Sequence, residues 1–450
     1  MATLDRWRQF LTTPKTLEFP RLALIGLDFS PPIVVGSGQV EMVSPTSFTF
    51  TLNGTPADIN YALAQLRRQR ENPYDGFARF RLIGTDLDGV EWTGGYTTSP
   101  VISTAGKVWK VTGEIASLDT SEQGDGVSQQ AGTELIFLLR IGDPLTLAVT
   151  GLPTLNPPGT TPRREHAIEV LGSHIRFAYE DTTGTFVLTA SQSSDLQAPY
   201  AENWLSEPLR IIFGQLIYPR LVARNFGDGR AIIQVRRSAS VIRGARWAAL
   251  CGGIGRTADD GQLWTLYAQL LEFVAHAHGD SDTPNFESHK LTRLYEEVIQ
   301  AALGSRWVWA LTFASSVEAL AKMLIPKNAK PTENEAEAIE ALVAHINTGP
   351  GESRLKKVAI SAVRRTAEIT TIRALRDLKA NGVITDAQLS AWEKIRHAVM
   401  HGSLVSPYST AEDDSRLLAL SAMMHALTAE LLRRSITASA QQHPQSNTSR

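Results

Sequence analysis

The sequence predicts an α+β protein with two domains: a β-rich, sandwich- or barrel-like domain in residues 1–205 and an α-helical bundle in residues 261–436. Three observations predict this. Short runs in the first half alternate apolar and polar residues, as strands with one buried face do. From Asp260 onward the apolar residues recur at helical spacing instead. The 450 residues are enough for two or three domains, and residues 206–260 form a transition segment between the two patterns.

The strand candidates of the first half are separated by residues that favour turns, such as Asn53-Gly54 and Asp88-Gly89. These candidates are 47–54, 77–84, 107–115, 174–181 and 185–191. Strands at this density indicate an antiparallel sandwich or barrel. One helix is expected at 56–71, and one further strand is expected in the transition segment after the Asp228-Gly229 turn.

The second half contains seven helix candidates. They are 262–278, 286–303, 306–324, 334–346, 352–382, 385–402 and 410–435. The 352–382 helix is expected to run unbroken to Asn381-Gly382, and Thr385 is expected to cap the next helix, which stops at Gly402. The polar tail, 437–450, is expected to be disordered.

Composition limits the classes of function. The net charge of only -2 provides no global basic field, so any contact with RNA has to be local. The single cysteine, Cys251, excludes an intrachain disulfide framework and indicates a reducing compartment. The first ten residues lack the apolar run of a signal peptide, and no stretch reaches the ~18 apolar residues that a membrane span needs. We therefore expect a cytoplasmic protein that does not bind membranes.

The most informative segment is 392–402, WEKIRHAVMHG, in which Arg396 precedes His401 by five residues. Positions four apart nearly align on a helix, so His397 and His401 share a face, and Arg396 needs its long side chain or a local unwinding to join them. His401 would lie in the last turn, where the helix dipole favours the imidazolium form. An arginine and a histidine held together can bind and cleave an RNA phosphodiester without a metal. The alternative is a plain helix end, with Arg396 solvated and His401 bonded to terminal carbonyls.

This segment resembles the signature of the HEPN superfamily, in which an arginine, commonly followed by a polar residue, precedes a histidine by four to six residues. Arg396-His397-Ala-Val-Met-His401 fits that pattern, and the β-rich first half joined to a helical second half resembles the ApeA type of prokaryotic anti-phage protein. The resemblance implies a helical bundle over 286–435 that dimerises, with two motifs facing each other in one metal-independent RNase site.

The resemblance also implies roles for individual residues. His401 would deprotonate the ribose 2′-hydroxyl, Arg396 would hold the scissile phosphate, and His397 would orient or polarise it. The products would be a 2′,3′-cyclic phosphate and a 5′-hydroxyl. Many family members place an acid against the motif arginine, and Glu318 is the candidate here. Its alternative is an ordinary pair with Lys322, four residues further along the helix.

The sequence thus predicts a homodimeric endoribonuclease whose β-rich half senses a trigger, for instance a phage-derived one. RNA is the expected substrate, with tRNA among the candidates, and no cofactor, metal or DNA is expected. The alternative is a non-catalytic recognition protein whose β domain binds a ligand and whose bundle dimerises or binds RNA.

Two weaker patterns have two interpretations each. The arginines at 236, 237, 243 and 246 are either a soluble strand edge or a phosphate contact. His276 and His278, with acids nearby, are either ordinary polar residues or metal ligands.

Overall fold

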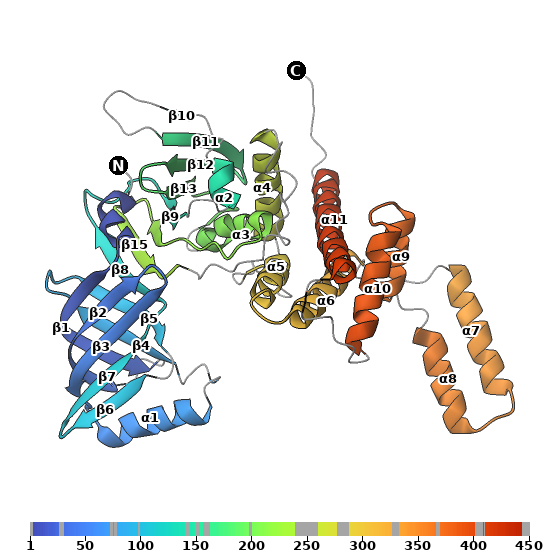
Figure 1. Cartoon of the computed structure of the whole chain (residues 1–450), viewed down its shortest axis with the longest axis horizontal. Coiled ribbons are helices and arrows are strands. Elements are labelled where there is room, and N and C mark those ends of the chain that lie inside the picture. Colours follow the sequence, from blue (N-terminus) through green and yellow to red (C-terminus); the bar gives the residue numbers. More distant parts are fainter. Residues whose placement is uncertain are drawn as a thin grey trace. The chain divides into compact units, whose positions relative to one another are not determined.

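A computed structural model of the chain describes most of its residues (Figure 1). The described residues are 3–26, 31–72, 75, 79–97, 100–139, 144–149, 154–155, 163–197, 200–238, 260–276, 288–325, 333–365, 370–400, 408 and 410–442. The chain divides into two compact units. Unit 1 comprises Met1–Val241 and Gly253–His289, and unit 2 comprises Ile242–Gly252 and Lys290–Arg450.

An antiparallel β-sheet region is followed by a helical region, which confirms the predicted α+β layout. The strands are β1 Lys15–Gly26, β2 Val34–Ser44, β3 Ser47–Thr55, β4 Phe80–Thr85, β5 Glu91–Thr97, β6 Val101–Ala105, β7 Val108–Glu114, β8 Ser117–Gln123, β9 Gly132–Leu138, β10 Thr154–Leu155, β11 Arg163–Val170, β12 Ser173–Glu180, β13 Thr185–Ser191, β14 Leu221–Asn225 and β15 Arg230–Arg236. They pair in the single order β10-β11-β12-β13-β9-β14-β15-β8-β5-β4-β1-β2-β3-β7-β6. Among these described strands β10 and β6 end the order, so the pairing does not close the sheet into one barrel.

Strand β3 alternates buried and half-buried residues, whereas β9 is buried almost continuously. In β3 the apolar Phe48, Phe50 and Leu52 are buried, whereas the threonines between them are half-buried, as the two-residue period of a strand requires. The inner strand β9, between β13 and β14, is buried along almost its whole length. The sheet also extends past residue 205, because β14 and β15 lie within the expected transition segment.

The helix α3, Ala201–Phe213, was not predicted from the sequence. Its polar residues Glu202, Ser206 and Arg210 recur at helical spacing, but Pro208 lies inside the segment, and a proline argues against a helix interior. Its buried Glu202 accepts hydrogen bonds from Arg224 and Arg236. Burial would raise the pKa of Glu202, but the two guanidinium groups outweigh it and lower that pKa. Because β15 is an inner strand, interpreting Arg236 as part of a soluble strand edge is wrong.

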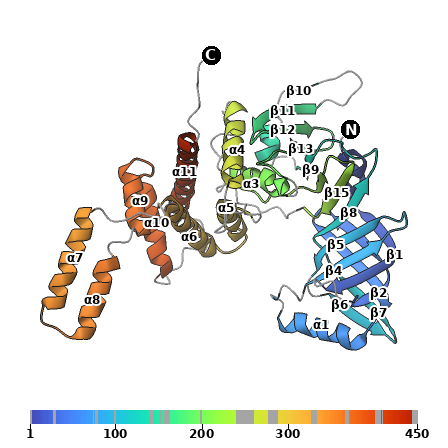
Figure 2. The same ribbon diagram turned by 180° about the vertical axis from the view of Figure 1, so that it is seen from behind.

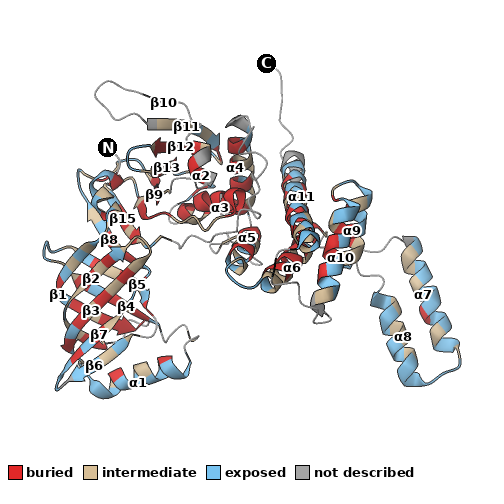
Figure 3. Ribbon diagram, viewed as in Figure 1, coloured by how far each residue is buried: buried red, intermediate tan, exposed pale blue. Residues whose placement is uncertain are grey.

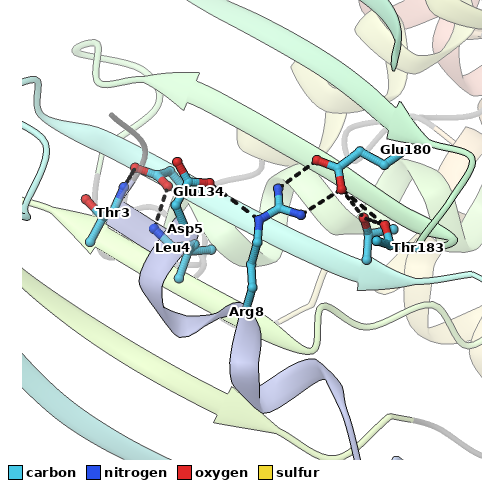
Figure 4. A network of polar contacts seen from close by, with 8 residues as sticks. Thr3, Leu4, Asp5, Arg8, Glu134, Glu180 and Thr183 are labelled. Carbon is cyan, nitrogen blue, oxygen red and sulfur yellow. Dashed lines mark hydrogen bonds and ion pairs between the residues drawn. The ribbon is translucent and has the colours of Figure 1, made fainter. Parts of the chain in front are cut away.

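The first described segment is a 3-10 helix, η1 Thr3–Leu11, that polar contacts fasten to the sheet (Figure 4). The backbone N–H groups of Thr3 and Leu4 donate to the Glu134 carboxylate at 3.0 and 3.1 Å. Helix N-termini leave such donors without intrahelical partners, and Glu134 of β9 supplies the acceptor. Arg8 then donates to both oxygens of Glu180, at 2.8 and 2.9 Å.

Arg220 is a fully buried cation that joins three parts of unit 1. Its guanidinium donates to the backbone carbonyls of Phe10, Pro45 and Arg236 and stacks on the ring of Phe48 at 4.4 Å. Burial lowers its pKa to about 10, so the group stays charged near neutral pH. The sequence pattern, in which Arg220 follows a proline in a transition segment, did not indicate this role.

Both units contain further helices. They are α1 Ile59–Glu71, α2 Pro144–Val149, α4 Asp260–Ala275, α5 Lys290–Ala301, α6 Arg306–Leu324, α7 Glu333–Thr348, α8 Ser353–Arg365, α9 Thr371–Ala380, α10 Asp386–Met400 and α11 Ala411–Gln442. In unit 2, α6 and α11 pack on each other, and α5, α9 and α10 pack around them. Tyr295 of α5 is buried at the centre, where its hydroxyl lies 3.0 Å from that of Thr428 on α11.

The prediction of one unbroken helix over 352–382 is wrong. The helix α8 ends at Arg365, and α9 begins after Thr370, whose extended backbone and side chain cap the new helix by accepting from the Arg373 N–H. The reason lies in the run Ile369-Thr370-Thr371-Ile372, since β-branched side chains disfavour a helix interior and threonine favours its start. The last helix, by contrast, continues beyond its expected end to Gln442, into the segment expected to be disordered.

Arg434 joins α11 to the end of α6, and a carboxylate of its own helix orients it. The nearly buried Glu430 accepts hydrogen bonds from Arg433 and Arg434, and Arg434 donates to the backbone carbonyl of Leu324 at 2.8 Å. The Arg433 hydrogen bond, followed by that of Arg434, overcomes burial and lowers the pKa of Glu430 to about 2.

Candidate active site

The candidate site lies in unit 2, where α10 packs on α6. The start of α10 has reciprocal caps: the Gln388 N–H donates to the Thr385 hydroxyl at 3.2 Å, and the Thr385 N–H donates to the Gln388 side chain at 2.8 Å. This confirms Thr385 as the predicted cap. Further along, Trp392 is buried and its indole N–H donates to the Ala314 carbonyl of α6 at 3.1 Å. That bond fixes the rotation of α10 and thereby the place of the next turn.

Arg396 follows Trp392 by one turn and extends toward Glu318 of α6. The Arg396 Nε donates to the Glu318 Oε2 at 3.4 Å, and the guanidinium lies over the Trp392 ring, 5.5 Å from its centre. No hydrogen bond joins the two terminal NH₂ groups of Arg396 to another described residue. Terminal NH₂ groups of an arginine are the paired donors that bind planar or tetrahedral anions in proteins.

Glu318 also pairs with Lys322. Its Oε1 lies 3.0 Å from the Lys322 Nζ, whereas Oε2 faces Arg396. The two partners that the sequence offered as alternatives are therefore both present. Partial burial would raise the pKa of Glu318, but the hydrogen bonds and charges of Lys322 and Arg396 outweigh it and lower that pKa. Near neutral pH the three groups together carry one net positive charge.

These side chains line a cavity of about 710 Å³. Its walls are Glu318, Lys322 and Ile325 from α6 and its end, Thr370, Thr371 and Ile372 at the start of α9, and Trp392, Glu393, Arg396 and His397 from α10. The wall combines two acids, Glu318 and Glu393, with two cations, Lys322 and Arg396. Such a cavity offers cationic side chains and hydroxyl groups to an anionic ligand.

The structure describes one of the two histidines of the motif. His397 is exposed on α10 and lines the cavity next to Arg396. His401, the predicted base, lies outside the described residues. The structure thus brings Glu318, Arg396 and His397 together around one cavity, and His401 follows in sequence just beyond the end of α10.

Sequence reasoning did not identify the contribution of α9. Thr370 and Thr371 were expected in the interior of a long helix, but they form the beginning of α9 on the cavity wall. The β-branched run before Arg373 is the signal that would have indicated this start. Lys322 was considered only as a partner of Glu318, although it too lines the cavity.

The weaker patterns fall partly outside the described residues. Arg237 lies 3.4 Å from Glu114, and Arg243 and Arg246 are outside. His276 directly follows α4 and contacts the Glu272 carbonyl of that helix, and His278 lies outside the described residues. Within the described ranges, no group of three or more His, Cys, Asp or Glu side chains is placed to hold a metal ion. None of the described helices combines the length and apolar character needed to cross a membrane.

Comparison of the chain with protein-family models, with curated proteins and with solved structures found no match.

Proposed function

We propose that this protein is a metal-independent endoribonuclease of the HEPN type, acting as a homodimer in the cytoplasm of a prokaryote. The observation that carries the proposal is the Arg396–Glu318 contact on the wall of a cavity that His397 also lines. Glu318 engages Arg396 through Nε, which leaves the terminal NH₂ groups for a phosphate.

In this proposal Arg396 binds the scissile phosphate and stabilises the negative charge that grows on its oxygens during attack. His401 removes the proton of the ribose 2′-hydroxyl, which attacks the adjacent phosphorus. The bond to the 5′-oxygen of the next nucleotide breaks, and that oxygen takes a proton from water to become the 5′-hydroxyl. His397 orients the phosphate, and Glu318 positions Arg396. The products are a 2′,3′-cyclic phosphate and a 5′-hydroxyl, and the β-rich unit 1 serves as the regulatory part in an anti-phage response.

The experiment compares expression of the wild-type chain with that of His401→Ala in bacteria, with and without phage infection, and sequences the RNA ends. We expect growth arrest and new 5′-hydroxyl ends with the wild type alone. The purified wild-type protein should cleave RNA in EDTA, because 2′-hydroxyl attack needs no metal.

Full cleavage by a folded His401→Ala protein would contradict the proposal, as would activity that EDTA abolishes and Mg²⁺ restores. RNA binding without cleavage by the wild type would favour the alternative, a recognition protein in which the bundle binds RNA without cutting it.

A further inference from the structure

The helices α7 and α8 form an antiparallel hairpin in unit 2 (Figures 1 and 2). Of the side chains whose burial is described, only Val343 is buried in α7 and none is buried in α8 (Figure 3). Helices of 16 and 13 residues are marginal in water on their own, because most helical stability in proteins comes from burying an apolar face. The hairpin therefore lacks the burial that would stabilise it.

An apolar stripe on α8 faces solvent. Leu355 and Val358 are 63% and 62% exposed, and the exposed Ala362 continues their row at helical spacing. The half-buried Ile360 and Val363 lie on another side of the helix, so α8 is apolar on two sides. On α7, Leu342 is 47% exposed, and the exposed Ala338 lies one turn before it.

The two helices carry opposite charges. The helix α7 contains Glu333, Glu335, Glu337 and Glu340 and no lysine or arginine. The helix α8 contains Arg354, Lys356, Lys357, Arg364 and Arg365 and no acid. Within the hairpin, one exposed pair joins the two sets, with Arg364 and Glu340 at the long distance of 3.8 Å, and Glu335 pairs with Arg373 of α9 at 2.8 Å. Acids thus flank the exposed apolar row of α7, and bases flank that of α8.

We propose that the α7–α8 hairpin is the docking surface for a second copy of this chain, with α7 of each copy lying against α8 of the other. A two-fold interface uses the same surface on both copies, so that surface must be complementary to itself. One acidic and one basic helix side by side meet this requirement. The two-fold axis places the acidic α7 of each copy against the basic α8 of the other. The four helices then bury their apolar rows as a small bundle.

The charges of α7 and α8 also favour one kind of binding partner over others. RNA or an acidic protein would match α8 but would meet the acidic α7 beside it, at an electrostatic cost. A second copy satisfies both helices. The proposal does not rest on RNA cleavage, and it assigns the interface to a different surface from α10 and α11, through which the family resemblance implies dimerisation.

The first test measures the mass of the full chain by light scattering during gel filtration at micromolar concentration. We expect the wild type to have the mass of two 49.2 kDa chains. The double variant Leu355→Asp/Val358→Asp buries carboxylates in the proposed interface and should associate about 100-fold more weakly, or not at all. The matched control is Leu418→Asp on α11, where the replaced side chain is 53% exposed, and it should remain dimeric.

The second test keeps the apolar rows intact and changes only charge. Glu333→Lys/Glu337→Lys/Glu340→Lys leaves one acid and three lysines on α7 and gives a copy with two basic helices. Arg354→Glu/Lys357→Glu/Arg364→Glu leaves two cations and three acids on α8 and gives a copy with two acidic helices. Each alone should be a monomer, and an equimolar mixture should form a heterodimer, since acid again faces base in both contacts. Helical circular dichroism checks that each variant is folded.

Three outcomes would overturn the proposal. They are a wild-type chain that stays monomeric at every concentration, a folded Leu355→Asp/Val358→Asp variant that dimerises as well as the wild type, and a charge-reversed pair that does not associate when mixed. Dissociation by Leu418→Asp alone would assign the dimer to α11 instead. A monomeric wild type would overturn both this interface and the homodimer of the proposed function, whereas the other two outcomes overturn the interface alone. RNA cleavage is measured separately, so an intact dimer without cleavage would contradict the proposed function and leave the interface standing.

Discussion

Replacing Arg396 with alanine should remove most RNA cleavage and little stability. Two contacts hold this side chain: the 3.4 Å bond to Glu318 and the position over the Trp392 ring at 5.5 Å. The side chain is 49% exposed, so the ion pair contributes roughly 0.2–1 kcal/mol and the cation–π contact about 0.5–1 kcal/mol to the free energy of unfolding. The helix α10 keeps its buried Trp392 bond to α6. We therefore expect a loss of about 1–2 kcal/mol in stability.

The effect on catalysis should be far larger. Removing a donor that stabilises charge in a transition state typically costs about 10²–10³ in rate. The assay measures initial rates of RNA cleavage together with urea unfolding followed by circular dichroism. Arg376→Ala is the matched control, because Arg376 forms an exposed pair with Glu393 at 3.6 Å and does not line the cavity. It should change neither rate nor fold.

Two results would refute this reasoning. An Arg396→Ala protein that is folded and cleaves RNA at the wild-type rate would exclude Arg396 as the phosphate-binding residue. A loss of stability above about 3 kcal/mol would show that the side chain holds the bundle together more strongly than a half-exposed ion pair can.

Two further predictions concern neighbouring parts of unit 2. Lys322→Ala should weaken binding of 2′-O-methyl RNA, which lacks the nucleophile, and reduce the slope of log affinity against log salt by about 0.7, as loss of one phosphate contact does. The exposed Lys394, outside the cavity wall, provides the control, and an unchanged slope would exclude a phosphate contact by Lys322. Glu430→Gln should lower the free energy of unfolding at pH 7 by about 1–2 kcal/mol. The pKa of about 2 alone would imply ~3 kcal/mol, but the arginine partners of Glu430 are exposed, and solvent weakens their pairing. Since the folded-state pKa is depressed, this contribution is full above pH ~4.5 and should vanish as the pH falls toward 2; a difference from wild type that persisted at low pH in urea unfolding would contradict the assignment.

The sequence predicted the helical half well where helix ends carry their own chemical signals. The boundaries of α6 coincide with the predicted 306–324, because Ser305 caps its start and a proline follows its end. The capping residue of α10 was likewise identifiable from Thr385. The break between α8 and α9 was missed because charged and apolar residues continue at helical spacing on both sides of it, and periodicity outweighed the β-branched run.

Unit 1 was harder to predict because tertiary contacts satisfy its polar groups. Arg220 has no charged partner nearby in sequence, and its acceptors are carbonyls from Phe10, Pro45 and Arg236. Glu134 meets the start of η1 across more than a hundred residues of chain. A local pattern contains no information about such contacts, since each depends on which strands become neighbours in the sheet.

The candidate site shows how a local and a distant interaction combine. The spacing of Glu318 and Lys322 predicted a pair within one helix, and that pair was considered an alternative to a role beside Arg396. A carboxylate has two oxygens that accept hydrogen bonds, so one partner does not exclude the other. In the structure Lys322 faces Oε1 and Arg396 faces Oε2. Local pairing thus orients the carboxylate for the distant contact: it fixes Glu318 on α6, and Glu318 in turn accepts the hydrogen bond of the Arg396 Nε.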